Sequence, residues 1–179
     1  MSKSKPYPGT QAISRAISLL KVFTDNRPEW SLAELTREAK LSKTTTYRLL
    51  AALESEEMVA RNLNNNTYHL GLGAITLGGY ALRTHDLRAI AQPELKELAD
   101  AAQETAALEL LIDADVLILD EVAGNRVISG GQAIGTRWPA HATSTGKAML
   151  SCLSLEQVEA ILPRPLPSIT AHTITDLDG

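Results

Sequence analysis

The chain has 179 residues, of which 44% are hydrophobic, and a formal net charge of −4, so it can form one large or two small globular domains. Its single cysteine, Cys152, excludes an intrachain disulfide and indicates a reducing compartment. No apolar run approaches the roughly 20 residues of a membrane span, and the first residues lack the apolar core of a signal peptide, so we expect a soluble, cytoplasmic protein with no membrane partner.

The chain opens with a segment rich in lysine, proline and glycine, residues 1–10, which we expect to be a flexible arm. A helix is predicted next, because apolar residues recur at helical spacing and could pack behind the two helices that follow. These apolar residues are Ile13, Ala16, Ile17, Leu20, Val22 and Phe23.

Residues 31–53 have the layout of a helix, a short turn and a second helix. Ser31 and Glu34 form a Ser-x-x-Glu capping box for the first helix, and Ser42 can cap the second. The face of the second helix that we expect to be buried contains Thr46, Leu49, Leu50 and Leu53. This is the layout of a helix-turn-helix, whose second helix lies in the DNA major groove.

The opposite face of the second helix is basic and rich in hydroxyl groups. The candidate DNA-contacting residues here are Ser42, Lys43, Thr44, Thr45, Tyr47 and Arg48. Such donors suit a mixture of phosphate and base-edge contacts, and Arg48 could bind guanine in bidentate fashion. The alternative is an ordinary solvated face, which is what most charged helix faces are.

Two short strands are predicted at 58–61 and 67–70, joined by the asparagine-rich residues 62–66. Asparagine tolerates left-handed backbone geometry, so this connector suits a hairpin. Three helices and a hairpin make a winged helix-turn-helix over residues 11–72. The wing would carry Arg61 and the asparagines to a phosphate backbone or a minor groove, although for any single asparagine we favour a plain loop tip.

A connecting helix is predicted at 73–84, weakened by two adjacent glycines. The helical stripe that follows contains Leu87, Ile90, Ala91, Leu95, Leu98 and Ala99. Because Pro93 lies inside this stripe, we expect a kink or a break there.

The apolar runs 106–112 and 116–122, separated by a polar turn, predict two paired strands. Helices are predicted at 144–152 and 155–162, and the second of these has Ser154 and Gln157 in capping-box positions. A sheet covered by helices is therefore expected in the second half of the chain.

A loop of small, hydroxyl-bearing residues enters the helix predicted at 144–152. Free backbone N–H groups and the helix dipole would meet there and suit an anion, such as a carboxylate ligand. The candidate ligand-binding residues are Trp138, Ala142, Thr143, Ser144, Thr145 and Gly146. Alternatively these residues only cap the helix, and Trp138 serves the core or a subunit contact.

Several apparent catalytic motifs in the same region are incomplete. Ser144 and Lys147 satisfy the Ser-x-x-Lys pattern, but its Ser-Asp-Asn and Lys-Thr-Gly partners are absent from the sequence. A phosphate-binding loop would need a glycine where His141 stands and a hydroxyl residue in place of Ala148. His141 and Cys152 lack the further ligands of a zinc site. We therefore predict no catalytic residue, no metal and no cofactor.

The chain resembles the IclR family of bacterial transcriptional regulators. The resemblance of residues 11–78 to the family's DNA-binding half rests on AISLL at 16–20, LSKTTTYRLLAAL at 41–53 and YHLG at 68–71. It continues through Arg126-Val127 and PAHATSTGKAML at 139–150, which is similar to a stretch of the family's effector-binding domain.

This resemblance implies an α+β chain with a winged helix-turn-helix, a linker helix at 73–84 and a GAF-like α/β sensor domain over 85–179. Members bind small metabolites, often organic acids or aromatic compounds, near the second motif. Members also usually run further, so we expect residues 85–179 to be the N-terminal portion of that domain.

The expected function is that of a ligand-responsive regulator that binds a pseudo-palindromic DNA operator as a homodimer or homotetramer, with half-sites about one helical turn apart. A net charge of +3 on residues 1–70 and −7 on 71–179 fits a DNA-binding part joined to a sensor. Two alternatives remain: a DNA-binding protein that no longer senses a ligand, and a small-molecule enzyme built on the second half. The sequence does not distinguish a repressor from an activator.

Overall fold

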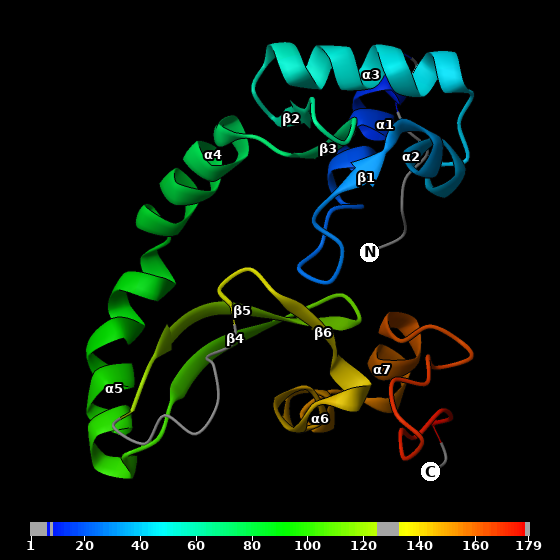
Figure 1. Cartoon of the computed structure of the whole chain (residues 1–179). Coiled ribbons are helices and arrows are strands. Elements are labelled where there is room, and N and C mark those ends of the chain that lie inside the picture. Colours follow the sequence, from blue (N-terminus) through cyan, green and yellow to red (C-terminus); the bar gives the residue numbers. More distant parts are fainter. Residues whose placement is uncertain (1–6, 8, 125–132, 178–179) are drawn as a thin grey trace. The chain divides into compact units, whose positions relative to one another are not determined.

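The computed structural model describes residues 7, 9–124 and 133–177 and divides the chain into two compact units, Met1–Thr84 and His85–Gly179 (Figure 1). Most of the arm expected at residues 1–10 lies outside the described residues, as do Arg126 and Val127. None of the described helices is both long and apolar enough to cross a membrane.

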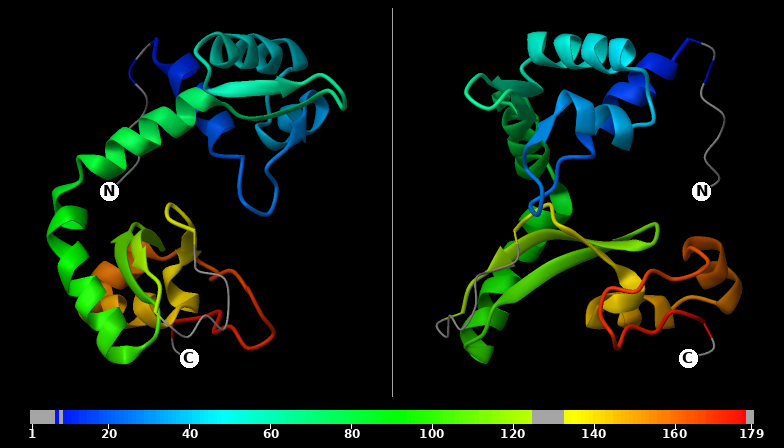
Figure 2. Two further views of the ribbon diagram at one scale, coloured as in Figure 1. Left: turned by 60° about the vertical axis from the view of Figure 1, so that its left-hand side comes forward. Right: turned by 45° about the vertical axis from the view of Figure 1, so that its right-hand side comes forward.

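The first unit contains three helices, a three-stranded antiparallel sheet and a further helix. The elements are α1 (Gln11–Leu20), β1 (Trp30–Ser31), α2 (Leu32–Glu38), α3 (Lys43–Ser55), β2 (Val59–Asn62), β3 (Thr67–Leu70) and α4 (Leu72–Arg83). The sheet order is β1-β3-β2, and the β2–β3 hairpin projects from the helices as a separate ribbon (Figure 2). The predicted winged helix-turn-helix is therefore confirmed, with β1 as an additional strand.

Both predicted helix caps of the helix-turn-helix are present. The Ser31 hydroxyl accepts a hydrogen bond from the Glu34 backbone N–H, and the Glu34 carboxylate accepts one from the Ser31 N–H, which completes the capping box. The Ser42 hydroxyl accepts a hydrogen bond from the Thr45 N–H at 3.2 Å. Because each cap satisfies an otherwise unpaired N–H, each fixes where its helix begins.

One hydrophobic core holds the first unit together. Its buried members are Leu19, Phe23, Trp30, Leu35, Leu50, Val59 and Tyr68. On α3, Thr46 and Leu50 are buried as predicted, while Leu49 and Leu53 are half-buried against the core.

The buried face predicted for the first helix is only partly right, because Leu20, Val22 and Phe23 reach the core and two isoleucines do not. Ile13 and Ile17 are 61% and 48% exposed, whereas Leu19 is fully buried. The helix ends at Leu20, so Val22 and Phe23 reach the core from beyond its end and do not continue its face. Continuing one helical period past that end placed Ile13 and Ile17 on the buried face, whereas both remain on the surface.

The linker helix α4 begins in close contact with the end of α3. The Gly71 N–H donates to the Met58 carbonyl, and the Gly73 N–H donates to the Glu57 carbonyl. A Cβ on Gly71 would lie 2.2 Å from the Glu57 carbonyl oxygen, and one on Gly73 would lie 2.9 Å from that of Glu56. Only glycine permits these two backbones to approach so closely.

The second unit is built on an antiparallel sheet of order β4-β5-β6. Its elements are α5 (Asp86–Ala102), β4 (Ala106–Ile112), β5 (Asp115–Val122), β6 (Arg137–Pro139), the 3₁₀ turn η1 (Ala140–Ala142), α6 (Ser144–Ser151) and α7 (Leu155–Ile161). The paired strands, the two later helices and the Ser154–Gln157 capping box are as predicted, whereas β6 was not predicted. A register shift interrupts the pairing of β4 and β5 between Leu108 and Glu109.

Helix α5 runs without a break through Pro93, so of the kink or break predicted there the break is wrong. Proline removes one intrahelical hydrogen bond and leaves the carbonyl four residues earlier without it. Pro93 and Ala89 are both exposed, so water can solvate that carbonyl. The predicted apolar stripe is also only partly buried, because Leu95 and Ala99 face the core while Leu87, Ile90 and Leu98 are exposed.

The core of the second unit is divided between the two ends of the β4–β5 ribbon. Near one end, Leu95 and Ala99 of α5 pack on Ala106. Near the turn end, Val116 packs with Ala140, Leu150, Leu162 and Leu166. In Figure 1, α5 accordingly lies beside one end of the ribbon and α6 beside the other.

A buried ion pair ties α5 to β5. Asp120 is 1% exposed, and its Oδ1 lies 3.1 Å from Arg88 Nη2 and accepts the Glu121 N–H at 3.0 Å. Asp120 Oδ2 and Arg88 Nε are also buried, and neither has a hydrogen-bond partner in the described part of the chain. Arg88 is therefore the charged partner of the Asp120 carboxylate.

Candidate nucleic-acid interface and ligand site

Helix α3 presents the candidate DNA-contacting face to solvent because its other face is anchored in the core. Thr46 is fully buried, and its hydroxyl donates to the Ser42 carbonyl at 3.1 Å. Leu50, one turn further on, is also fully buried. In Figure 1 the helix crosses the first unit with α1 and α2 beneath it. Core packing therefore fixes which side of α3 faces outward.

The six candidate residues of α3 and its cap divide into two groups. Lys43, Thr44, Tyr47 and Arg48 are exposed. Ser42 and Thr45 are engaged in the helix cap, where their hydroxyl oxygens lie 2.9 Å apart and the Ser42 oxygen accepts the Thr45 N–H. The cationic and phenolic donors thus point to solvent, while the two cap hydroxyls already have partners.

Arg61 lies on β2 next to the turn of the wing, exposed but held in place. Its Nε donates to the Asn66 Oδ1 at 2.9 Å, its Nη2 donates to the same oxygen, and its guanidinium lies 5.8 Å from the centre of the Tyr68 ring. Asn66 has a φ of 58°, as the predicted hairpin turn requires. The side chains of Asn62 and Asn66 thus bond within the wing, whereas Asn65 bonds both Thr67 in the wing and Glu29 outside it.

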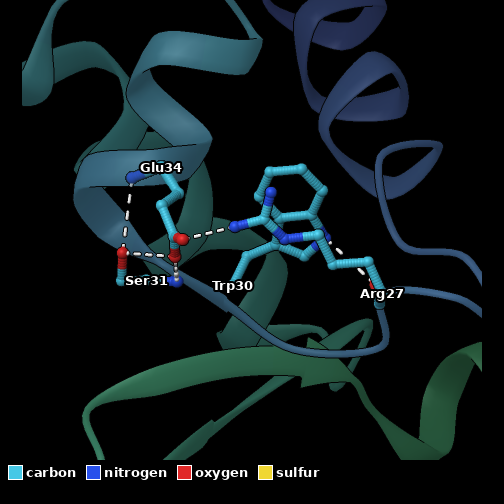
Figure 3. A network of polar contacts seen from close by, with 4 residues as sticks. All are labelled: Arg27, Trp30, Ser31 and Glu34. Carbon is cyan, nitrogen blue, oxygen red and sulfur yellow. Dashed lines mark hydrogen bonds and ion pairs between the residues drawn. The ribbon is translucent and has the colours of Figure 1, made fainter.

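A polar network at the start of α2 was only half predicted (Figure 3). The Arg27 guanidinium stacks 3.5 Å from the centre of the Trp30 ring and pairs with the Glu34 carboxylate. The Trp30 Nε1–H donates to the Arg27 carbonyl at 3.1 Å. Hydrogen bonds from Ser31, aided by the charge of Arg27, hold the pKa of Glu34 below its usual value. The capping box predicted Glu34, but no local pattern pointed to Arg27.

A cavity of about 240 Å³ lies where the ligand-binding loop was predicted. It is lined by Glu109, Trp138, Thr143, Ser144 and Thr145. Four of the six candidate residues therefore converge on one space between β4, β6 and the start of α6.

The two other candidates, Ala142 and Gly146, do not line this cavity. Gly146 is buried, and its N–H donates to the Thr143 hydroxyl at 3.0 Å. A Cβ at this position would lie 2.2 Å from the Ala140 carbonyl oxygen. Gly146 thus allows α6 to start against the 3₁₀ turn, and Thr143 caps the helix as well as lining the cavity.

Glu109 is the lining residue that the sequence did not indicate. It is the one carboxylate in an otherwise apolar strand, so nothing in its local pattern marked it. It adds a negatively charged acceptor to a site expected to suit an anion. The cavity therefore offers hydroxyl donors at the start of α6 and, on β4, an acceptor for a hydroxyl or N–H group.

His141 is buried, and one ring nitrogen lies 2.9 Å from the Pro167 carbonyl oxygen, which ties the 3₁₀ turn to the segment after α7. Within the described ranges, no three histidine, cysteine or acidic side chains gather in a way that could hold a metal ion.

Known proteins match both units. Residues 12–63 match the IclR helix-turn-helix domain, and residues 79–179 match the C-terminal domain of the bacterial transcriptional regulator IclR. The acetate operon repressor of Salmonella typhimurium is 32% identical over 156 residues, which cover 86% of this chain and 57% of the repressor. The chain thus spans little more than half the length of this relative.

Solved structures give the same result. An IclR transcriptional regulator from Silicibacter superposes with a TM-score of 0.78 at 27% identity, over 92% of this chain and 65% of that protein. An IclR homologue from Microbacterium hydrocarbonoxydans, complexed with 4-hydroxybenzoate, superposes with a TM-score of 0.71 at 25% identity. The match covers 93% of this chain and 69% of that protein. Proteins of this kind are transcriptional regulators rather than enzymes. The resemblance seen in the sequence is confirmed, and the chain belongs to the IclR family of bacterial transcriptional regulators.

Proposed function

We propose that the chain is a ligand-responsive transcriptional regulator acting on double-stranded DNA in the cytoplasm. In this proposal residues 11–72 form the DNA-binding domain, and residues 73–84 form a helix that links it to the effector-binding domain at 85–179. Residues 1–10 form a flexible arm. The observation that carries the proposal is α3, whose buried face is locked in the core while Lys43, Tyr47 and Arg48 face solvent.

In this proposal, α3 lies in a major groove and the wing reaches the neighbouring backbone. Arg48 reads a base edge, while Lys43, Thr44 and Tyr47 contact phosphates or bases. Ser42 and Thr45 support these contacts from the helix cap, and Arg61 approaches a phosphate from the wing. Each of these contacts adds a salt-sensitive or base-specific component to binding.

A homodimer or homotetramer is the proposed binding form. The first unit exposes apolar side chains on α1 and α4, namely Ile13, Ile17, Leu72, Ile75, Leu77 and Tyr80. Exposed apolar groups of this number favour an interface, and two-fold symmetry is the commonest arrangement of identical subunits. A symmetric pair would present two α3 helices to a pseudo-palindromic operator.

The proposed effector is a small organic molecule bound in the cavity of about 240 Å³. This volume falls just below the ~300–1,000 Å³ typical of drug-sized ligands, so it suits a small metabolite. Ser144 and Thr145 at the start of α6 would donate to an oxygen of the ligand, Trp138 would cover an apolar part, and Glu109 would accept from a hydroxyl. A carboxylate would be placed near α6 and away from Glu109. A phenolic acid, the class of the ligand in the Microbacterium homologue, carries both groups.

The deciding experiment is a salt-titrated binding assay on the DNA upstream of the chain's own gene, with a scrambled duplex as control. The proposal predicts preference for the native fragment and an affinity that falls as salt rises. Equal affinity for both duplexes would reject sequence-specific regulation. If binding is specific, a panel of small organic acids and phenols should shift it; flat affinity across the panel would favour a DNA-binding protein that no longer senses a ligand.

A further inference from the structure

A carboxylate from outside the wing is bonded to the tip of the wing. Glu29 lies one residue before β1, and its Oε2 accepts the Asn65 Nδ2–H at 2.9 Å and lies 2.7 Å from the Thr67 hydroxyl, which is shared with Asn65 Oδ1 at the same distance. Asn65 Oδ1 in turn accepts the Thr67 N–H at 3.3 Å. Glu29 is separated from these partners by 36 and 38 residues of sequence, so the contact forms only in the folded unit.

The tip of the wing is thereby restrained from two sides. Inside the hairpin, Arg61 bonds Asn66. Outside it, β1 pairs with β3 only through Trp30 with Tyr68 and Ser31 with Thr67, so backbone pairing stops where the turn begins. Glu29 extends this support into the turn. Hairpins with little support are marginally ordered in water, so the added side-chain contacts matter most at the tip.

We propose that Glu29 is a positioning residue for DNA binding: it orders the tip of the wing, residues 62–67, before DNA arrives and so sets where Arg61 meets the duplex. This inference rests on the proposed DNA-binding function. A carboxylate near DNA phosphates would by itself weaken binding, and its bonds to the wing explain why it is tolerated there.

The charge state of Glu29 supports this role. Hydrogen bonds from Thr67 and Asn65, with a smaller contribution from the nearby His69, hold the pKa of Glu29 below its usual value. Glu29 is therefore ionised at neutral pH, and its bonds to the wing are charge-assisted, a stronger class than neutral ones.

Two substitutions separate the bonds from the charge. Glu29→Ala removes both, whereas Glu29→Gln removes the charge and keeps a carbonyl oxygen whose two lone pairs can accept from Asn65 and Thr67. Glu38→Ala, at an exposed carboxylate at the end of α2, is the matched control for loss of charge. All variants are made in the full chain, with thermal melting as the check on folding.

Glu29→Ala is expected to weaken specific DNA binding about 3- to 10-fold, as for one or two lost hydrogen bonds, while binding to a scrambled duplex changes little. Glu29→Gln should stay within about 2-fold of wild type on the same reasoning. In the free protein, amide hydrogen exchange across residues 62–67 should accelerate in Glu29→Ala alone. Asn65→Ala should be non-additive with Glu29→Ala in a double-mutant cycle.

Equal effects of Glu29→Ala and Glu29→Gln would mean that a hydrogen-bond acceptor at residue 29 does not order the tip of the wing, and would overturn the proposal. So would unchanged specific binding by Glu29→Ala when the wild type binds its operator. If the wild type itself shows no preference for the native DNA, the regulator proposal fails instead, and hydrogen exchange in the free protein still shows whether Glu29 orders the wing. Should Glu29→Ala not fold, the Asn65→Ala variant tests the same contact from its other side.

Discussion

The two units of this chain are stabilised in different ways. The first has one core, and its polar side-chain contacts are hydrogen bonds near the surface, at helix ends and at the wing. Examples are Ser31 with Glu34 and Glu29 with Asn65. The second has a core divided between the two ends of a hairpin, with one buried ion pair, Arg88 to Asp120. Loss of a polar group should therefore cost the first unit little stability and the second unit much.

The largest effect is expected at Asp120. Asp120→Ala leaves the half-buried Arg88 guanidinium without its partner, and loss of a hydrogen bond to a charged group costs about 1.5–3 kcal/mol. Denaturation by urea, followed by circular dichroism, should show the transition of the second unit at lower urea while that of the first is unchanged. Glu97→Ala, at an exposed position on α5, is the control and should stay within about 0.5 kcal/mol. A wild-type-like transition for Asp120→Ala would contradict the comparison.

Gly146→Ala should come next. The new Cβ would lie 2.2 Å from the Ala140 carbonyl oxygen, so the start of α6 must shift. Forced overpacking of this kind costs about 1–3 kcal/mol, and it should also weaken any ligand bound in the cavity. Gly78→Ala is the matched control, because nothing lies within 4 Å of its added Cβ within helix α4. It should stabilise the chain by about 0.4–1 kcal/mol. Both shifts can be measured in one urea series, and equal signs would refute the packing argument.

On the first unit, the corresponding test is of binding rather than of stability. Arg48→Ala should weaken specific binding by about 1–3 kcal/mol and relax base preference at one position. Lys43→Ala should weaken binding to all sequences alike and reduce the salt slope by about 1. Both variants should melt like wild type, because both side chains are exposed. If Arg48→Ala left the operator affinity unchanged, Arg48 would not belong to the recognition surface.

The smallest effect concerns pH. The pKa of Glu34 is held below its ordinary value of 4.5 by hydrogen bonds from Ser31. Its contribution to stability is therefore present above pH 4.5 and is lost as the pH falls through the lower, folded-state pKa. Comparing wild type with Glu34→Gln in urea from pH 7 down to pH 3, the difference between them should shrink at the acid end. A difference that grew on acidification would have the wrong sign.

The sequence predicted best those features whose cause lies within a few residues. The caps at Ser31, Ser42 and Ser154 were found because the donor and acceptor are three positions apart. The strands β4 and β5 were found because each is a long apolar run. The strands β1 and β6, of two and three residues, are too short to leave a periodic pattern and were missed.

Contacts between distant residues could not be predicted in the same way. Arg27 with Glu34, Glu29 with Asn65 and Arg88 with Asp120 each join residues seven or more apart, and a charge in isolation does not name its partner. Glu109 lines the cavity because of how β4 pairs with β5. The hydrophobic pattern of β4 alone does not determine that pairing register. For α1, the period was right, but the helix ended before the apolar run did.

The close approach of Gly71 and Gly73 to the end of α3 bears on how chimeras of such regulators should be built. Because the backbone at residues 71–73 is hydrogen-bonded to Met58 and Glu57, this segment belongs structurally to the winged helix-turn-helix and not to the rest of the linker helix. A fusion joint placed at residue 71 would separate a transplanted winged helix-turn-helix from Gly71 and Gly73, which the backbone after α3 requires. A joint placed after residue 73 keeps the hydrogen-bonded segments 57–58 and 71–73 in one piece. The rest of α4 can then be taken from another regulator.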